Sequence, residues 1–141
     1  PGDALAKGVP AVNASIGGGE ALVLEAIMTF FLVWIVWASA VDPRGTFKSI
    51  AGLGIGLAIT MDIFAGGALT GAAMNPARAF GPQLAGNHWA DGWVWYLGPV
   101  LGALAAAFLY EWLYLRPVAP IPVGPEETGV LEPRPGHTAA S

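Results

Sequence analysis

The residues best suited to chemistry in this sequence form one short cluster, Asn75-Pro76-Ala77-Arg78. Asparagine is a preferred N-cap residue and proline is favoured at the first helical position, so the pair predicts that a helix begins at Pro76. The aligned peptide dipoles give the N-terminus of such a helix roughly half a positive charge, which suits an anion. A neutral molecule is the second candidate, because an Asn75 side chain whose oxygen accepts from a backbone amide keeps its NH2 group free to donate.

Arg78 lies one turn into this predicted helix. A guanidinium at membrane depth is costly unless water or carbonyl groups surround it. We therefore expect Arg78 to line a lumen, where it would donate hydrogen bonds to a solute and oppose the passage of protons and cations. The simpler alternative is an ordinary capped helix with a surface arginine, but the location of the cluster between two apolar segments favours the lumen.

The composition places this cluster in a membrane protein. Of the 141 residues, 55% are hydrophobic and 11% are charged, whereas soluble domains carry about a quarter charged residues. The net charge of −4 and the scattered basic residues exclude nucleic acid as a partner. The absence of cysteine excludes disulfides and thiolate chemistry, and His88 and His137 lack partners at metal-ligand spacing. We therefore expect no metal and no cofactor. We also expect no enzymatic reaction.

Three segments are apolar enough to cross the membrane hydrocarbon, which takes about 20 helical residues. They lie at about residues 21–41, 49–65 and 93–115. The segment at about 66–84, which contains the cluster, is too apolar for an exposed loop and too broken by glycine and proline for a span. Non-helical backbone at membrane depth is tolerated only where protein buries it or where it lines a water-filled cavity. The sequence thus predicts an all-α, multi-pass integral membrane protein with three transmembrane helices and one re-entrant half-helix.

Basic residues at the ends of the spans predict the orientation of the chain. Two lie in the loop between the first two spans and Arg116 closes the third, and such residues favour the cytoplasmic side. Residues 1–19 are then the remnant of an extracellular-side loop, and the proline-rich residues 117–141 form a disordered cytoplasmic tail. Residues 20–116 form the membrane unit between them. Because the chain begins without Met, we expect it to be part of a longer protein; the sequence does not identify its membrane.

One acidic residue interrupts each of the first two spans. Glu25 lies deep in the first, and an intramembrane carboxylate is by default functional or paired. Support of the re-entrant segment and proton relay are its two candidate roles. Asp62 lies closer to the end of the second span, where we expect it to cap backbone groups or to be solvated.

Small residues recur every four positions in the second and third spans. Gly52 and Gly56 form one such stripe, and Gly98, Gly102 and Ala106 form the other. Stripes of this kind let two helices approach closely. We expect both to lie in helix contacts.

The segment around the cluster, GAAMNPARAFGP, resembles the second NPA loop of the aquaporins, the major intrinsic protein family. The resemblance covers roughly residues 18–116 and includes EAIMTF at 25–30, Asp42-Pro43-Arg44 and WYLGP at 95–99. It implies a six-helix channel made of two inverted halves, each contributing an NPA half-helix. The spans then correspond to helices four to six, and the N-terminal half with its own NPA motif is missing.

The same resemblance implies roles for single residues. Asn75, Pro76 and Ala77 would line the centre of the pore. Glu25 would support the loop by accepting hydrogen bonds from its backbone, which favours the first of its two candidate roles.

Three further positions would belong to the selectivity filter. Ile63 and Ala72, which are found by counting back from Asn75, occupy two of these filter positions, and Arg78 occupies the third. Ile, Ala and Arg in these places are similar to the tonoplast intrinsic proteins and to the related aquaporins that pass ammonia and urea. An isoleucine in place of the imidazole of orthodox water channels removes a donor, which should relax strict selectivity for water.

Three places distinguish this sequence within the family. Ala79 stands where glycerol channels have Asp, which argues against a glycerol facilitator. Gln83 replaces the usual Ala or Arg, and Trp95-Tyr96 reverses the more common Tyr-Trp order.

The expected function is passive transmembrane diffusion of water, with ammonia, urea and hydrogen peroxide as candidate small neutral solutes. The expected partners are the lipid bilayer, these solutes, the missing N-terminal half and, in the complete channel, three further copies in a homotetramer. The alternative is a truncated, non-conducting membrane fragment that acts only as a helical packing module.

Overall fold

The computed structural model describes residues 8–45 and 48–116, and throughout these ranges the regular structure is helical. The long helices are α2 (Gly18–Val36), α3 (Ala51–Thr70) and α5 (Trp93–Tyr110), and α4 (Pro76–Gly86) is short. Two π-helical turns, η1 (Trp37–Val41) and η3 (Glu111–Leu115), extend α2 and α5, and the 3₁₀ turn η2 (Lys48–Ile50) precedes α3. Three stretches are long and apolar enough to cross a membrane, namely Gly18–Val41, Lys48–Thr70 and Trp93–Leu115. The predicted all-α membrane fold with three spans is thereby confirmed.

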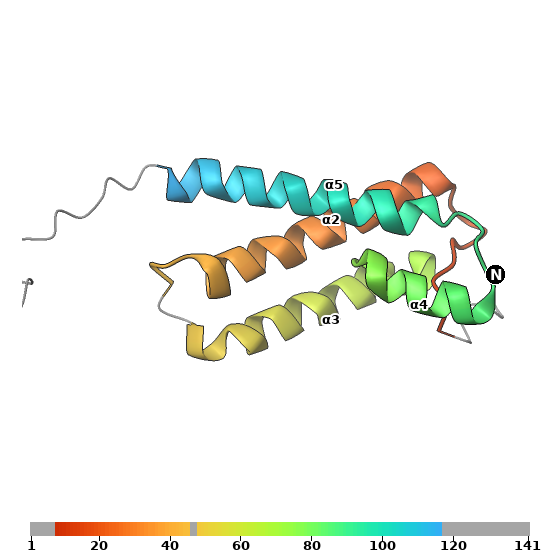
Figure 1. Cartoon of the computed structure of the whole chain (residues 1–141), viewed down its shortest axis with the longest axis horizontal. Helices are drawn as coiled ribbons and strands as arrows, with labels where there is room; N and C mark the ends of the chain where they lie inside the picture. Colours follow the sequence, from red (N-terminus) through yellow and green to blue (C-terminus); the bar gives the residue numbers. More distant parts are fainter. Residues whose placement is uncertain (1–7, 46–47, 117–141) are drawn as a thin grey trace, which may run out of the picture.

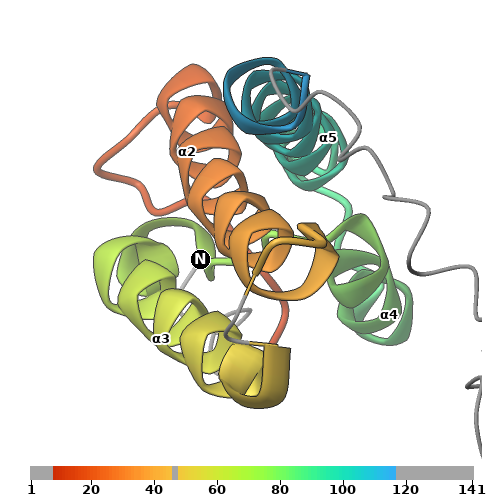
Figure 2. The same ribbon diagram turned by 90° about the vertical axis from the view of Figure 1, so that its left-hand side faces the viewer.

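The central helix of the bundle is α2, which packs against α5 on one side and α3 on the other. Figure 2 shows this arrangement from the end of the bundle, and Figure 1 shows α4 beside the part of α5 where that helix begins. The short helix therefore lies at one end of the molecule, within the length of the bundle.

The contact between α2 and α5 is close because α5 presents small residues to it. Gly98, Gly102 and Ala106 are buried, and a side chain at Gly102 would collide with the backbone of Ala26. This stripe is a helix contact as predicted, since it lets two backbones approach directly. The expected helix contact of the other stripe is not found within the described residues: Gly52 and Gly56 are exposed, and no described atom lies within 4 Å of a Cβ added at either position.

Helix α3 continues to Thr70, beyond the expected end of the second span near residue 65. Its last turns remain helical because they pack on α2, where a side chain at Gly66 would collide with that of Met28. The helix ends at Gly71, which adopts the left-handed conformation with φ of 84° and allows a tight C-terminal turn. The non-helical part of the re-entrant segment is therefore residues 71–75.

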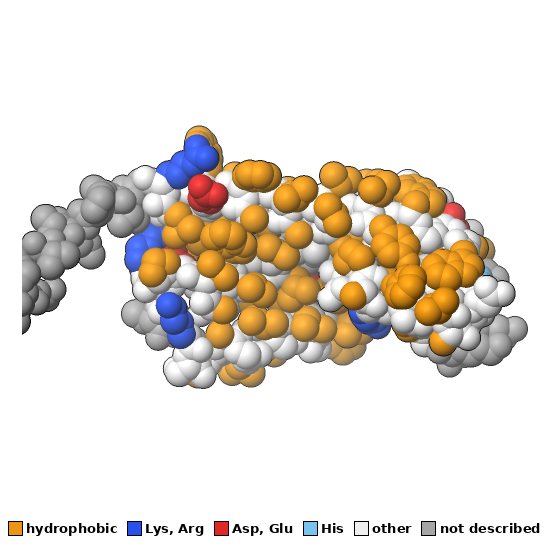
Figure 3. Space-filling view, viewed as in Figure 1, with side chains coloured by type: hydrophobic (Ala, Val, Ile, Leu, Met, Phe, Trp, Pro, Cys, Tyr) orange, Lys and Arg blue, Asp and Glu red, His pale blue; other side chains and the backbone are white. Residues whose placement is uncertain are grey.

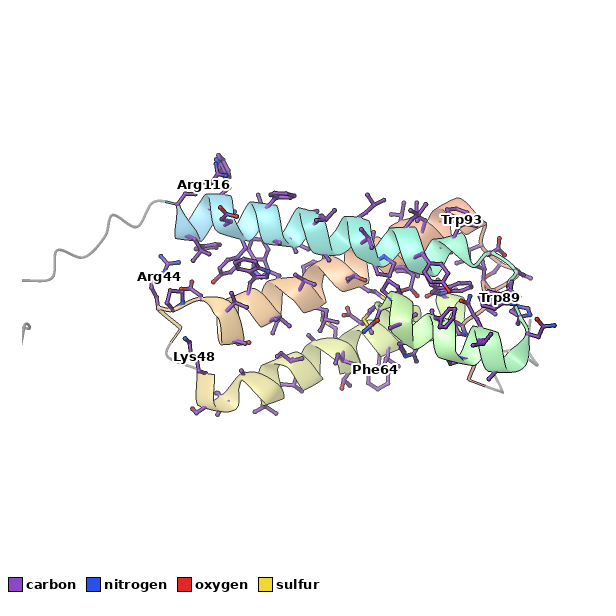
Figure 4. The ribbon with its side chains drawn as sticks, in the orientation of Figure 1. Arg44, Lys48, Phe64, Trp89, Trp93 and Arg116 are labelled. Carbon is purple, nitrogen blue, oxygen red and sulfur yellow. The ribbon has the colours of Figure 1, made fainter. Side chains whose placement is uncertain are left out.

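The outer surface of the bundle suits a membrane. Figure 3 shows hydrophobic side chains along the length of the viewed face, and Phe64 is 87% exposed. Arg44, Lys48 and Arg116 lie at one end and Trp89 is at the other, as labelled in Figure 4. Basic residues at one end of the spans and tryptophan at the opposite end are typical of the two membrane interfaces.

Candidate functional site

The carboxylate of Glu25 holds the non-helical residues that follow α3. Its side chain comes from α2 and is fully buried. Oε1 accepts from the hydroxyl of Thr70 at 2.6 Å and from the amide of Ala73 at 2.9 Å, and Oε2 accepts from the amide of Met74 at 2.8 Å. Hydrogen bonds to an ionised acceptor are roughly twice as strong as neutral ones. They compensate for the burial of the charge, which costs several kcal/mol when a carboxylate has no partner.

The backbone between α3 and α4 is strained where it meets this carboxylate. Ala72 and Met74 have φ of 43° and 52°, in the left-handed region that costs a residue with a side chain about 1–2 kcal/mol. The amide of Met74 and the intervening amide of Ala73 donate to Glu25. A single side chain from another helix thus stabilises a conformation that the segment would not favour alone.

Helix α4 begins at Pro76, with Asn75 as its N-cap. The side-chain oxygen of Asn75 accepts from the amides of Ala77 at 2.9 Å and Arg78 at 3.3 Å. Its Nδ2 donates to no group in the described ranges, and the residue is exposed. The Asn75 side chain is therefore oriented by its oxygen, while its NH2 group keeps its capacity to donate.

The structure brings two of the three predicted filter residues to one cavity. Ile63 from α3 and Arg78 from α4 both line a cavity of about 480 Å³. Arg78 is exposed, and its Nη1 donates to the carbonyl of Gly71 at 3.2 Å, so a backbone carbonyl orients the guanidinium. The remaining lining residues are Gly8, Val9, Pro10, Gly67, Ala68 and Gly71.

Ala72, the third predicted filter residue, does not line this cavity. Its side chain is fully buried and packs with Met28 and Met74. The left-handed conformation turns it toward α2 while Gly71 borders the cavity in its place.

A strap formed by residues 8–16 supplies one wall of the cavity, and the sequence analysis did not identify it. Asn13 fixes it to the end of α3, because its amide donates to the carbonyl of Leu69 at 2.8 Å and its Nδ2 donates to that of Ala68 at 3.2 Å. These carbonyls belong to the last turn of α3, where no helical donor remains for them. The strap therefore caps the helix and forms part of the cavity.

Trp95 and Tyr96 contact the re-entrant segment from α5. The indole Nε1 of Trp95 donates to the carbonyl of Thr70 at 3.1 Å, and Trp95 is fully buried. The hydroxyl of Tyr96 donates to Oε1 of Gln83 on α4 at 3.0 Å. Trp95, Tyr96 and Gln83 depart from the aquaporin pattern, and this departure was the only sign of these contacts in the sequence. Thr70 is 25 positions from Trp95, and Gln83 is 13 positions from Tyr96.

Asp62 has surroundings different from those expected. It is 2% exposed rather than solvated, and its Oδ2 has no hydrogen-bond partner within the described part of the chain. It caps no backbone group there, because it lies in the middle of α3 on the face that packs against α2. The prediction that Asp62 is solvated or acts as a cap was wrong.

A polar cluster at the opposite end of the bundle joins the loop after α2 to α5. Arg44 donates to both oxygens of Asp42, at 3.0 and 2.8 Å, and Tyr110 donates to Oδ2 at 2.9 Å. The hydrogen bonds from the side chain and backbone of Arg44 lower the pKa of Asp42 well below its ordinary value, with a smaller contribution from Tyr110. The same pairing raises the pKa of Arg44. Asp42 is therefore a charged anchor between loop and helix.

Comparison with known proteins identifies the family. The model of the family described as Major intrinsic protein matches residues 3–110. Aquaporin TIP3-2 of Zea mays is 46% identical over 123 residues, which are 86% of this chain and 44% of that protein. Aquaporin TIP3-1 of Zea mays is 43% identical over 134 residues, 90% of this chain and 48% of the relative. Probable aquaporin TIP3-2 of Oryza sativa subsp. japonica is 54% identical over 94 residues, 67% of this chain and 36% of the relative.

The chain spans less than half the length of these relatives. The family match covers most of the chain and coincides with the three apolar helices and the segment that Glu25 holds. The chain is an integral, multi-pass membrane protein, and it belongs to the major intrinsic protein family, the aquaporins.

Proposed function

We propose that this chain forms the C-terminal half of a channel through which water and small neutral solutes diffuse passively across a membrane. The observation that carries the proposal is the set of hydrogen bonds from Thr70, Ala73 and Met74 to the buried Glu25. They hold non-helical backbone inside a bundle of membrane-spanning helices. Such backbone is stable at membrane depth only where protein buries it or where it borders water, and a cavity borders this segment.

The polar groups of Arg78 and Asn75 suit neutral solutes. Arg78 lines the cavity and has further N–H groups beside the one that Gly71 accepts. Asn75 does not line this cavity; its side chain is exposed, and its NH2 group has no acceptor within the described ranges. The positive charge of Arg78 and the partial positive charge at the N-terminus of α4 both repel protons and cations. Water, which can accept from such donors and is uncharged, passes this barrier while a cation does not.

Ile63 extends the proposal to solutes other than water. Its side chain is apolar and 48% exposed at the cavity that Arg78 also lines. A constriction with one apolar and one cationic wall retains a donor but does not surround a permeant molecule with polar groups. Ammonia, urea and hydrogen peroxide are therefore the additional solutes that we propose.

The opposite wall of the pore comes, in this proposal, from an inverted N-terminal half. Large apolar side chains cover the outward face of α3: Leu53 is 63% exposed and Leu57 is 61% exposed. Such a face packs against lipid or against another helix. The length of the relatives supports a second half, and a homotetramer of complete channels is part of the same proposal.

Stopped-flow osmotic shrinkage of proteoliposomes tests the function. One preparation contains the 141-residue chain, and the other contains this chain joined to the N-terminal part of maize TIP3-2 that it does not cover. We expect water permeability well above that of protein-free vesicles for the fusion and no excess for the chain alone, because one half-helix leaves the pore without its opposite wall. A fusion with Lys48→Gln, which is remote from the cavity, serves as the matched control and should conduct normally.

Two outcomes contradict the proposal. A folded, inserted fusion with the permeability of empty vesicles would favour a non-conducting packing module. Conduction by the chain alone would show that the second half is unnecessary.

A further inference from the structure

Thr70, the last residue of α3, is held from two different helices. Its hydroxyl donates to Glu25 on α2 at 2.6 Å, and its carbonyl accepts from the indole of Trp95 on α5 at 3.1 Å. Thr70 and Trp95 are both fully buried. The point at which the chain leaves α3 and enters the re-entrant segment is therefore fixed between α2 and α5.

Trp95 also lies in a buried apolar cluster that includes parts of the segment and of the half-helix. The cluster contains Ala73 of the segment and Ala79 of α4. Ala73 donates its amide to Glu25, so the cluster includes a residue that Glu25 holds. Trp95 is therefore linked to the end of α3 by its hydrogen bond to Thr70, and to the segment and α4 through this cluster.

Tyr96 fixes the far part of the half-helix. Successive side chains on a helix point about 100° apart, so Tyr96 faces α4 while Trp95 faces the segment. The hydroxyl of Tyr96 donates to Oε1 of Gln83 at 3.0 Å, and Gln83 is fully buried. Nε2 of Gln83 has no acceptor within the described ranges, so the bond to Tyr96 is the polar contact that orients this buried amide.

We propose that Trp95, Tyr96 and Gln83 form a brace from α5 that positions the re-entrant segment and, through α4, the guanidinium of Arg78. None of the three lines the cavity, so they are positioning residues that do not contact a solute. Arg78 lies in the first turn of α4, and a tilt of α4 moves Arg78 relative to Ile63 on α3. The effect on solutes rests on the proposed channel function, whereas the brace itself is a property of the fold.

Amide hydrogen exchange tests the brace in the 141-residue chain reconstituted in lipid nanodiscs. Trp95→Phe removes the indole N–H and keeps an aromatic ring, and Tyr96→Phe removes only the hydroxyl. We expect the amides of residues 73–75 and 77–79 to exchange about fivefold faster in each variant, the factor that corresponds to the loss of one hydrogen bond of typical net strength. Trp112→Phe, at a 61% exposed position on the same span, is the matched control and should leave exchange unchanged.

A double-mutant cycle tests whether Tyr96 and Gln83 act as a pair. Gln83→Leu keeps the approximate size of the side chain and removes its amide. We expect Gln83→Leu with Tyr96→Phe to raise exchange no further than either change alone, because both remove the same bond. Additive effects would overturn the pairing. Unchanged exchange in both Trp95→Phe and Tyr96→Phe would overturn the brace.

Permeability separates positioning from simple stability. In the fusion with the maize N-terminal part, Tyr96→Phe should change the ratio of urea to water permeability at least twofold, because Arg78 is displaced. A merely structural role would lower both permeabilities together and leave the ratio constant, which would overturn the link to Arg78. If the fusion does not conduct at all, the proposed function fails while hydrogen exchange still decides whether the brace exists.

Discussion

The two buried carboxylates within the spans, Glu25 and Asp62, differ in what their neighbours supply. Glu25 receives one hydroxyl and two amide hydrogen bonds. Asp62 is equally shielded from solvent, but its Oδ2 receives none from the described residues. Burial alone therefore does not define the role of an acidic residue in a membrane helix. The hydrogen-bond donors around the carboxylate define its role, and at Glu25 these donors belong to the segment that forms the candidate pore.

Replacing Glu25 with glutamine should destabilise the re-entrant segment. The shape is nearly unchanged, but one acceptor oxygen becomes an NH2 donor, so at least one of the donors from Thr70, Ala73 and Met74 loses its partner. An unpaired buried polar group costs about 1–3 kcal/mol. We expect a lower Tm for Glu25→Gln in detergent, measured by the loss of helical circular dichroism. Glu111→Gln is the control, because the ion pair of Glu111 with Arg116 is exposed and contributes little; it should melt close to the unaltered protein, and an equal Tm for Glu25→Gln would refute its supporting role.

At the scale of the helices, the close approach of α2 and α5 depends on a position without a side chain. A Cβ at Gly102 would collide with the backbone carbonyl of Ala26, and neither backbone can move aside without separating the helices. Gly102→Val should therefore destabilise the bundle by about 1–3 kcal/mol or more. Gly52→Val is a matched control on α3, because nothing lies within 4 Å of a Cβ there. Unfolding titrations in sodium dodecyl sulfate compare the two, and equal midpoints would contradict the packing argument.

The anchor between the loop after α2 and helix α5 should make stability sensitive to acid. Arg44 lowers the pKa of Asp42 in the folded protein, so the unfolded chain takes up the proton first as the pH falls. The stabilisation is fully present above about pH 4, the ordinary range of an aspartate, and is lost progressively at lower pH. We expect Tm to fall by a few degrees between pH 5 and pH 3, and to fall less in Asp42→Asn. Parallel curves for the two proteins would show that Asp42 does not supply this sensitivity.

The local sequence predicted the start of the half-helix but not the contacts that place it. Asn75 and Pro76 specify a helix start because N-cap and first-turn preferences act within three residues, and α4 begins there. The pairs Trp95 with Thr70 and Tyr110 with Asp42 are 25 and 68 positions apart. They depend on how α2, α3 and α5 pack, which hydrophobic periodicity does not determine. The glycine stripes show the same limit, since equal spacing gave a helix contact at Gly102 and an exposed surface at Gly52.

At the scale of the whole molecule, the described residues form one side of a site. The strap at residues 8–16, helix α3 and helix α4 each supply a wall of the cavity that contains Ile63 and Arg78. These walls are fixed by Asn13, Glu25 and the α5 contacts. In the proposed channel, selectivity would therefore depend on this assembly, and it can be measured once the opposite wall is restored.

The ratio of urea or ammonia permeability to water permeability reports on this cavity directly. In the fusion with the maize N-terminal part, Ile63→His replaces an apolar side chain of the cavity that Arg78 also lines with a polar one. We therefore expect the ratio to fall several-fold while water permeability is retained. Arg78→Val removes both the charge and the donors, so larger solutes should pass more readily and the barrier to cations should weaken. The two changes act in opposite directions on one ratio, which a general loss of folded protein cannot imitate. If neither variant alters the ratio in vesicles of matched protein content, Ile63 and Arg78 do not form the filter, even though they line the same cavity.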